Sequence, residues 1–321
     1  MQSIFMFVGG LGLFLFGMKM MSEGLQKMAG KMLPFLLRKA TANSFSAFFI
    51  GIIVTMIVQS SSITTIMVVG FVNARLINLI GALGIIIGAN VGTAISSQII
   101  AFQINSIIPL FLFWGSTTYL FFKQEKIKNI GFIILGISIL FFGMNTMGLP
   151  LQELSEKTFF QDWVMKFENP FLAFLIGLIL TAIIQSSSAI IGIIVAMYFQ
   201  GIYFPFATAV FIILGSNIGT CVDTMIASIT GNRESKRAAI AHLLYNLITC
   251  LSAAIIITIF PLSLSLIQDA WPNEARQVVM FHTLFNIIGA LVFLPFIKIF
   301  SQLIIKIFPE KKTSFSNHEW R

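Results

Sequence analysis

Long apolar runs constrain this chain more than any other feature, because a helix that crosses the hydrocarbon core of a bilayer needs about 20 mostly apolar residues. Five apolar runs lie at 4–18, 106–122, 130–148, 238–266 and 278–304. Only 10% of the residues are charged, whereas a soluble domain typically carries about 25%. The sequence therefore predicts an all-α integral membrane protein that crosses its membrane several times.

The net charge of +8 does not indicate nucleic-acid binding, because the Lys and Arg residues lie between apolar runs, where cytoplasmic loops collect them. The first ten residues contain no basic segment, so they are expected to form a first span and not a cleaved signal. Cys221 and Cys250 lie in apolar segments without a CxxC pair or a His cluster, so neither a disulfide nor a transition-metal site is expected. We expect a multi-pass protein of the plasma (inner) membrane.

Three blocks of sequence recur in the same order at an offset of 126 residues, which becomes 127 after one insertion. A single QSSS would be typical of a helix N-cap or a polar turn, but two in register indicate an internal duplication. The paired blocks are IGIIVTMIVQSSS at 50–62 and IGLILTAIIQSSS at 176–188, GANVGT at 88–93 and GSNIGT at 215–220, and FGM at 16–18 and 142–144.

Loop charges predict that the two repeats are inverted relative to each other in the membrane. Residues 19–43 are basic on balance, whereas the equivalent residues 149–169 are acidic on balance. Because cytoplasmic loops are enriched in Lys and Arg, we expect the N-terminus outside and the C-terminus in the cytoplasm. The expected units are repeat 1 at 1–129, repeat 2 at 130–266, and a final transmembrane helix with a short basic cytoplasmic tail at 267–321.

Each QSSS motif ends an apolar run that is too short to cross a bilayer as a helix. Polar residues at membrane depth are tolerated only where they are buried in protein or line a water-filled cavity. We therefore expect each motif to form the tip of a re-entrant helical hairpin. We also expect the GANVGT and GSNIGT motifs to break the helices that contain them, and paired interrupted segments of this kind indicate a transporter binding site.

The chemistry of these motifs suits an anion together with a cation. Amide and hydroxyl groups donate hydrogen bonds, helix starts favour anions, and the same oxygens suit Na⁺. Neither motif contains Lys or Arg, so an oxyanion would need co-bound cations. Asp223 is expected to help bind a coupling cation, because a carboxylate at membrane depth is costly; the alternative is a solvated position near the inner surface. Its equivalent in repeat 1 is Ser96.

Two later segments share the pattern H-x-x-[YF]-N, beginning at His242 and at His282. A spacing of four places His and Asn on one face of a helix. We favour an interhelical hydrogen bond between scaffold helices over a contact with a proton or a substrate. An enzyme is not expected, because the serines of the tips have no base within local reach.

From about Phe5 to Leu303, the chain resembles the type II sodium–phosphate cotransporter family and its bacterial members. The paired QSSS motifs, GANVGT, GSNIGT and the opening FGMKMMSEGL at 16–25 carry the resemblance. It implies Na⁺-coupled movement of inorganic phosphate by alternating access. Some bacterial members carry a PhoU-like cytoplasmic domain after the last span, which we do not expect here because the chain ends soon after Lys306.

The resemblance also implies a set of site residues. Phosphate would be bound by Gln59, Ser60, Ser61, Ser62, Gln185, Ser186, Ser187 and Ser188. The cation-binding candidates are Ser62, Thr64, Thr65, Asn90, Thr93, Ser188, Asn217, Thr220 and Asp223. Thr64 and Thr65 extend the first tip, whereas Ala189 and Ile190 continue the second, so the two halves need not contribute equally.

Several alternatives stay open at this point. The coupling ion could be H⁺, the substrate could be sulfate or a phosphonate, and a passive anion channel is a less favoured reading. A membrane scaffold or sensor without transport would leave the duplicated polar tips unexplained. Expected partners are inorganic phosphate, Na⁺ and the lipid bilayer, with no nucleic acid; a homodimer is left open. No cofactor is expected other than Na⁺ as the coupling ion.

Overall fold

The computed structural model describes residues 2–39, 43–158, 160, 164 and 166–309, and within these residues the chain is helical and contains no strand. Six segments of this part are long and apolar enough to cross a membrane: Gln2–Ala29, Leu79–Ala101, Glu125–Ser155, Phe206–Ser228, Arg233–Ile259 and Glu274–Ile307. The prediction of an all-helical, multi-pass membrane protein is confirmed.

The helices of the first half are α1 (Gln2–Ala29), α2 (Met32–Lys39), α3 (Ser44–Val58), α4 (Ser61–Asn73), α5 (Leu79–Ser97), η1 (Gln98–Ala101), η2 (Asn105–Ile107) and α6 (Ile108–Phe121). Those that follow are α7 (Glu125–Ser155), α9 (Pro170–Ile184), α10 (Ser187–Phe199), α11 (Phe206–Gly219), α12 (Cys221–Ser228), α13 (Arg233–Ile259), α14 (Leu262–Ala270), α15 (Glu274–Phe293), η3 (Leu294–Phe296) and α16 (Ile297–Ile307).

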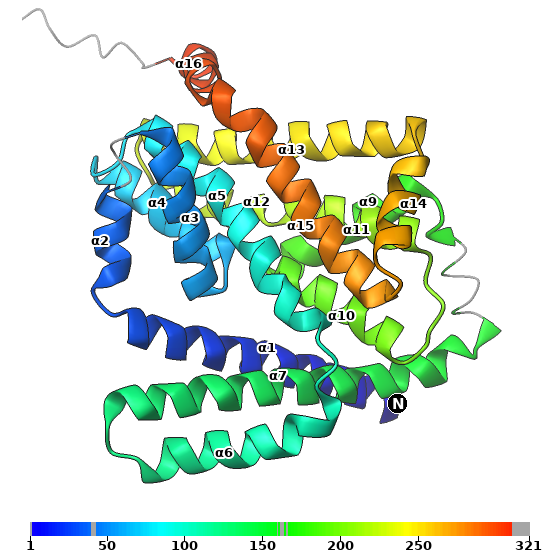
Figure 1. Cartoon of the computed structure of the whole chain (residues 1–321). Coiled ribbons are helices and arrows are strands. Elements are labelled where there is room, and N and C mark those ends of the chain that lie inside the picture. Colours follow the sequence, from blue (N-terminus) through cyan, green and yellow to red (C-terminus); the bar gives the residue numbers. More distant parts are fainter. Residues whose placement is uncertain (1, 40–42, 159, 161–163, 165, 310–321) are drawn as a thin grey trace, which may run out of the picture.

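Helices α1 and α7, which carry the two FGM blocks, lie antiparallel along one side of the molecule (Figure 1). Glycines allow their backbones to approach closely, as small residues do in membrane helix pairs. A Cβ at Gly17 would lie 2.3 Å from the backbone nitrogen of Leu140, and a Cβ at the equivalent Gly143 would lie 2.3 Å from that of Phe14. The contact is thus nearly symmetric, and the equivalent helices of the two halves run in opposite directions.

The two QSSS motifs join helix pairs of identical length, since α3 and α9 have 15 residues each and α4 and α10 have 13 each. The first helix of each pair packs closely on another helix of its own half, α3 on α5 and α9 on α11. A Cβ at Gly88 of α5 would lie 2.0 Å from the carbonyl oxygen of Phe48, and a Cβ at Gly215 of α11 would lie 1.9 Å from that of Phe174. The duplicated glycines therefore set the distance between each helix pair and its support.

These glycines correct one expectation. The prediction that GANVGT breaks its helix is wrong, because α5 is a continuous α-helix from Leu79 to Ser97. In the second half, α11 ends at Gly219 and α12 begins at Cys221, and the intervening Thr220 keeps right-handed helical angles of φ −66° and ψ −17°. Glycine was read as a helix breaker, whereas its missing side chain serves close helix packing here.

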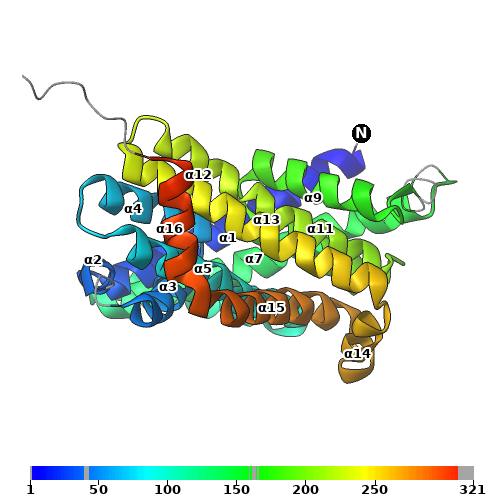
Figure 2. The same ribbon diagram turned by 90° about the horizontal axis from the view of Figure 1, so that it is seen from above.

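Basic segments and segments that carry acidic residues lie at opposite ends of the molecule. The α6–α7 loop and the start of α13, both basic, lie at the left of Figure 1, and α14 and the end of α7 lie at the right. Figure 2, which looks from above, shows the same separation for α12 and α14. This arrangement agrees with the predicted loop scheme within the described residues; which end faces the cytoplasm stays a prediction, and the tail 310–321 lies outside the described residues.

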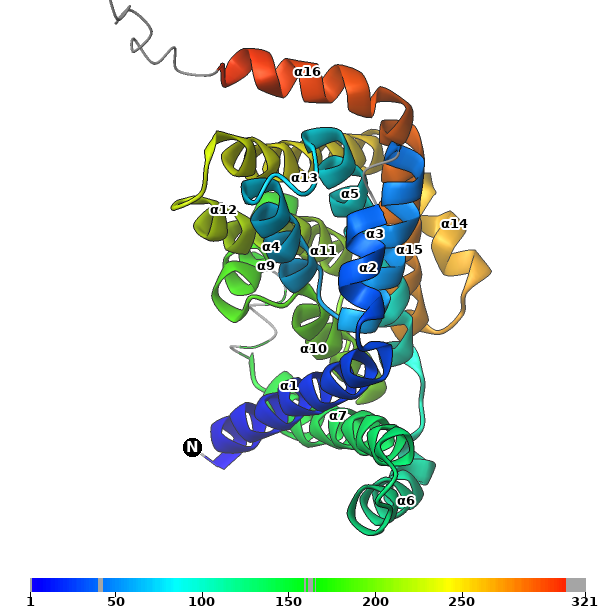
Figure 3. The ribbon, with the colours of Figure 1, turned by 90° about the vertical axis from the view of Figure 1, so that its left-hand side faces the viewer.

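Helices α13 and α15, which carry the H-x-x-[YF]-N patterns, pack against the helices that support the tips. Asn90 Nδ2 of α5 donates a hydrogen bond to Asn246 Oδ1 of α13 over 2.8 Å, and both side chains are buried. The favoured interhelical hydrogen bond is therefore confirmed for the first pattern. In the second, Asn286 Nδ2 donates to the carbonyl oxygen of His282 in its own helix. Figure 3 shows α16 turning away from α15 to lie across the top of that view.

Candidate functional site

The two QSSS motifs adopt the same local structure. Gln59 and Gln185 each end a helix in the left-handed conformation, with φ of 57° and 59°. The N–H of each donates to a threonine carbonyl one turn earlier, that of Thr55 or of Thr181. The next residue begins a new helix as its N-cap: Ser60 Oγ accepts from the N–H of Ile63, and Ser186 Oγ accepts from that of Ala189, both at 3.2 Å. Serine is a strongly favoured N-cap residue, so the motif itself dictates a helix–turn–helix tip.

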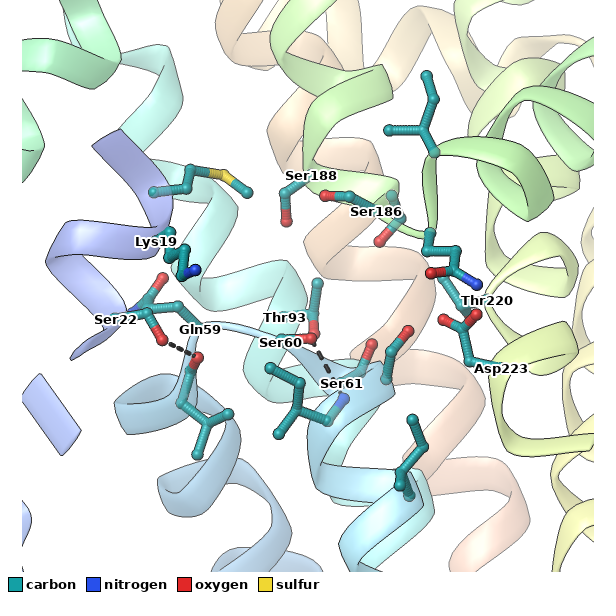
Figure 4. A pocket seen from close by; sticks show the side chains of 18 of the residues that line it. Lys19, Ser22, Gln59, Ser60, Ser61, Thr93, Ser186, Ser188, Thr220 and Asp223 are labelled. Atoms are coloured by element: carbon teal, nitrogen blue, oxygen red, sulfur yellow. Dashed lines mark hydrogen bonds between the residues drawn. The ribbon is translucent and has the colours of Figure 1, made fainter. Parts of the chain in front are cut away.

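The two tips line one cavity of about 590 Å³. Figure 4 shows Ser60 and Ser61 of the first tip facing Ser186 and Ser188 of the second. Helices α1, α5 and α12 complete the wall. The polar lining residues are Gln59, Ser60, Ser61, Ser62, Gln185, Ser186, Ser187, Ser188, Lys19, Ser22, Thr93, Thr220 and Asp223.

The start of a helix meets this cavity at each tip, because α4 begins at Ser61 and α10 begins at Ser187. The first N–H groups of a helix have no intrahelical partner, and the helix dipole places partial positive charge at the same point. Together they form an anion-binding environment. Two such helix starts on one cavity provide donors from both sides to a small oxyanion.

Three buried oxygens of the cavity wall make no hydrogen bond of normal geometry within the described residues. They are Thr93 Oγ1 and the two carboxylate oxygens of Asp223, whose side chain is only 7% exposed. The Ser62 hydroxyl is near enough to interact with that carboxylate. Because a buried carboxylate is costly unless a positive charge or hydrogen bonds compensate it, this part of the wall is suited to a cation.

A lysine also faces the cavity. Lys19 of α1 lies at its edge beside Ser22 and Gln59 (Figure 4), and its Nζ is 3.9 Å from Glu23. With 73% of the Lys19 side chain exposed, this ion pair is weak and leaves the ammonium group able to approach an anion. The neighbouring Ser22 Oγ donates to the carbonyl oxygen of Val58 over 2.5 Å, so α1 is fixed to the first tip.

A protein-family model matches most of this chain. The family model for the Na⁺/Pi-cotransporter matches two segments in succession, residues 13–149 and 145–291, which together cover most of the chain. The chain belongs to the Na⁺/Pi-cotransporter family. The two successive matches fall on the two halves that the internal duplication indicates.

Several curated proteins resemble this member of the Na⁺/Pi-cotransporter family. The uncharacterized protein YqeW of Bacillus subtilis is 34% identical over 303 residues, which cover 93% of this chain and 96% of YqeW. The putative inorganic phosphate export protein YjbB of Escherichia coli is 27% identical over 98% of this chain, but the chain spans only 58% of YjbB. The human sodium-dependent phosphate transport protein 2B is 34% identical over 100 residues, which are 30% of this chain and 14% of that protein. No solved structure matches.

All eight residues of the two QSSS motifs, which the sequence analysis predicts to bind phosphate, line the cavity of this cotransporter family member. Five of the nine cation-binding candidates line it as well: Ser62, Thr93, Ser188, Thr220 and Asp223. The other four do not: Thr64, Thr65, Asn90 and Asn217.

The four candidates outside the wall include three that the structure uses to join helices. Thr64 Oγ1 accepts from Thr55 within the first helix pair, and Asn90 binds α13 as described above. Thr65 and Thr224 share a hydrogen bond of 2.8 Å between their hydroxyls, which links the first tip to α12 next to Asp223.

Lys19 and Ser22 line the cavity but are not among the predicted site residues, because the segment that contains them is predicted to be an inner loop. Helix α1 continues to Ala29, however, and so includes Lys19. One signal was present: Lys19 and Ser22 are three residues apart, so a helix places them on one face. Their position immediately after the duplicated FGM block would have been a reason to include them.

Proposed function

We propose that this protein is a secondary active carrier that moves inorganic phosphate together with Na⁺ through the cavity between its two tips. The observation that supports this best is that one cavity wall contains both hydrogen-bond donors for an anion and buried oxygens for a cation. Helix starts and serine hydroxyls from both halves line the cavity, and the same wall contains the buried oxygens of Thr93 and Asp223, which make no hydrogen bond of normal geometry among the described residues.

Phosphate binding follows from the donors. The serine hydroxyls, the glutamine amides and the first N–H groups of α4 and α10 can all donate to phosphate oxygens. Lys19 adds a positive charge at the edge of the cavity. The eight residues of the two QSSS motifs are thus proposed to bind phosphate, with Lys19 as an additional attractive charge.

Na⁺ binding follows from the acceptors. Na⁺ is a hard cation, and the Asp223 carboxylate, the Thr93 hydroxyl and the nearby Ser62 hydroxyl offer oxygens of the kind that such ions prefer. A cation at this position would compensate the buried carboxylate and also attract the phosphate. Binding of either ion would therefore favour binding of the other, which is the basis of coupling.

Alternating access would follow from an inverted arrangement of the two halves. The antiparallel pairing of α1 with α7 and the identical tips support inverted repeats with re-entrant helix pairs, for which α3, α4, α9 and α10 have suitable lengths of 13 to 15 residues. A helix of 15 residues is about 22 Å long, shorter than the hydrocarbon core of about 30 Å. In such transporters, one unit moves against another around a site at mid-membrane.

The direction of transport depends on the combined gradients. The relative YjbB is named a putative phosphate export protein and human protein 2B is named sodium-dependent. Both names agree with phosphate as the substrate. H⁺ could neutralise Asp223 in place of Na⁺, and sulfate or a phosphonate could meet the same donors, so the test below compares them directly.

The purified protein in liposomes would be tested for uptake of radiolabelled phosphate under an inward Na⁺ gradient and under an equal K⁺ gradient. We expect uptake only with Na⁺, and its loss in the variants S61A and S187A. Ser265→Ala, in the exposed helix α14 and outside the cavity, is the matched control and should transport normally. Equal uptake in K⁺ would refute coupling to Na⁺, and uptake would then be measured under a pH gradient. If unlabelled sulfate competed as well as unlabelled phosphate, the assignment of phosphate as the specific substrate would be refuted.

A further inference from the structure

A second cavity, of about 260 Å³, lies where the start of α13 meets the end of α16. It shares no lining residue with the cavity between the tips. Three of its five lining residues are basic: Arg233, Lys236 and Arg237; Ile240 and Phe308 complete it.

Arg237 is fixed in this second cavity. Its side chain is 4% exposed, and its Nε and Nη2 donate to the carbonyl oxygen of Phe308 over 2.9 and 2.6 Å. Its Nη1 pairs with Glu234, one turn earlier on the same helix. The end of α16 is thus attached to the start of α13 through a buried guanidinium group.

The other two basic residues have no acidic partner within the described part of the chain. Neither Arg233 nor Lys236 forms an ion pair there, and the buried Nε of Arg233 has no hydrogen-bond partner. Among the residues that the structure describes, Glu234 is the one acidic side chain that pairs with this group of three basic residues. An anion that accepts several hydrogen bonds would satisfy the free donors and the excess charge, and Arg groups bind phosphate oxygens well in this way.

The position of α16 indicates where such an anion would come from. This helix follows a turn at Pro295 and lies across the top of Figure 3. In Figure 1 it lies toward the left, which is the side of the molecule where the basic α6–α7 loop also lies, at the lower edge. One face is buried through Phe300 and Ile304, while Ile299 and Leu303 are 65% and 50% exposed. A helix with a broad apolar face and flanking lysines is typical of the membrane interface.

We propose that Arg233, Lys236 and Arg237 form a binding site for a phosphoryl group at the membrane surface, most naturally the headgroup of an anionic phospholipid. The acyl chains would lie along the exposed apolar face of α16. Basic pockets near helix ends bind anionic lipid headgroups, because the positive side chains attract the negative phosphoryl group. The site is independent of the transport cavity, so it does not depend on the function proposed above.

The first experiment measures lipid binding by native mass spectrometry of the full-length protein with phosphatidylglycerol and with phosphatidylcholine. We expect preferential retention of phosphatidylglycerol, and a loss of affinity of roughly thirtyfold in R233Q/K236Q, or ~2 kcal/mol for two basic groups. Arg237 is left intact because it joins two helices. The matched control K123Q/K126Q removes one charge from the α6–α7 loop and one from the first turn of α7, neither of which lines the cavity, and should retain the lipid.

The second arm separates a lipid headgroup from free phosphate. Inorganic phosphate at millimolar concentration is added as a competitor, and its own binding is measured in phosphatidylcholine nanodiscs. Displacement of the lipid, with phosphate binding that R233Q/K236Q abolishes, would assign the same pocket to free phosphate. Retention of phosphatidylglycerol that is equal in the pocket variant and the loop control, without phosphate binding to the pocket, would overturn the site.

Discussion

The two tips have the same backbone but differ in how they are held. The first is tied on three sides: Ser22 of α1 donates to Val58, Thr55 bonds to Thr64 across the helix pair, and Thr65 bonds to Thr224 of α12. The second has no equivalent set of ties. Within the described residues, the side chains of Gln185, Ser187 and Ser188 make no hydrogen bond.

The threonines one turn before the tips show how this difference arises. Thr55 and Thr181 are equivalent, but Thr181 shares a hydrogen bond of 2.6 Å with Ser216 of α11 and so binds the supporting helix instead of its own partner helix. The duplicated motif therefore sets the shape of each tip, while the residues that differ around it set its attachment. The first tip is expected to be the more rigid of the two.

The two halves also differ in the charged side chains that they contribute to the cavity. Lys19 lies beside the first tip, and its equivalent in the second half is Asn145; Asp223 lies in the second half, and its equivalent is Ser96. One cavity thus receives its only two charged side chains, among the described lining residues, from different halves. The duplicated shape provides the donors, and the unduplicated residues provide the charge.

Asp223→Asn should have the largest effect, because no residue of the first half replaces this carboxylate. We expect the stimulation of phosphate uptake by Na⁺ to fall by about a hundredfold, which corresponds to about 2.7 kcal/mol. The measurement is initial uptake as a function of Na⁺ concentration, with Asp269→Asn in the exposed helix α14 as the control. Na⁺ dependence that is unchanged in D223N would show that the carboxylate does not bind the coupling ion.

Substitutions of the supporting glycines test whether the two halves are equally well packed. Gly88→Ala and Gly215→Ala each place a methyl group within 2.0 Å of a backbone carbonyl oxygen, and overpacking of this kind typically costs about 1–3 kcal/mol. We expect both variants to lower the midpoint of thermal unfolding in detergent. Gly12→Ala, where a Cβ meets no atom within 4 Å, is the control. A variant with normal stability in one half only would show that the packing is not truly duplicated.

The sequence predicted the two tips and the unduplicated Asp223, but not the packing role of the duplicated glycines or the place of Lys19 in the cavity wall. The QSSS motifs could be interpreted as tips because serine after an apolar run is typical of a helix start, and their pairing followed from the offset. The role of Gly88 was misread, because a glycine that breaks a helix and one that allows close packing have the same local sequence. Lys19 was missed because nothing local shows that α1 continues past it to form part of the cavity wall.

Lys19→Gln should have a smaller effect, which tests the unequal charge directly. We expect the KM for phosphate to rise about fivefold with little change in kcat, since an exposed charge contributes up to ~1 kcal/mol. Lys19→Arg should retain most of the affinity for phosphate. Lys27→Gln, in the last turn of α1 and outside the cavity wall, should have the wild-type KM. A KM in K19Q that matches the wild type would mean that both tips bind phosphate without help from α1.

Removal of one hydrogen bond that holds the first tip should have the smallest and most local effect. Ser22→Ala removes the hydrogen bond to Val58, which is worth about 1 kcal/mol, and leaves the cavity charges in place. We expect amide hydrogen exchange at residues 58–63 to rise by up to about fivefold, toward the rate at 184–189, because opening of the tip costs less. The control is Ser3→Ala, which removes a hydrogen bond to Glu153 far from the cavity. If the first tip exchanges as fast as the second already in the wild type, the hydrogen bonds to α1 and α12 do not make it more rigid, and the difference between the tips is one of charge alone.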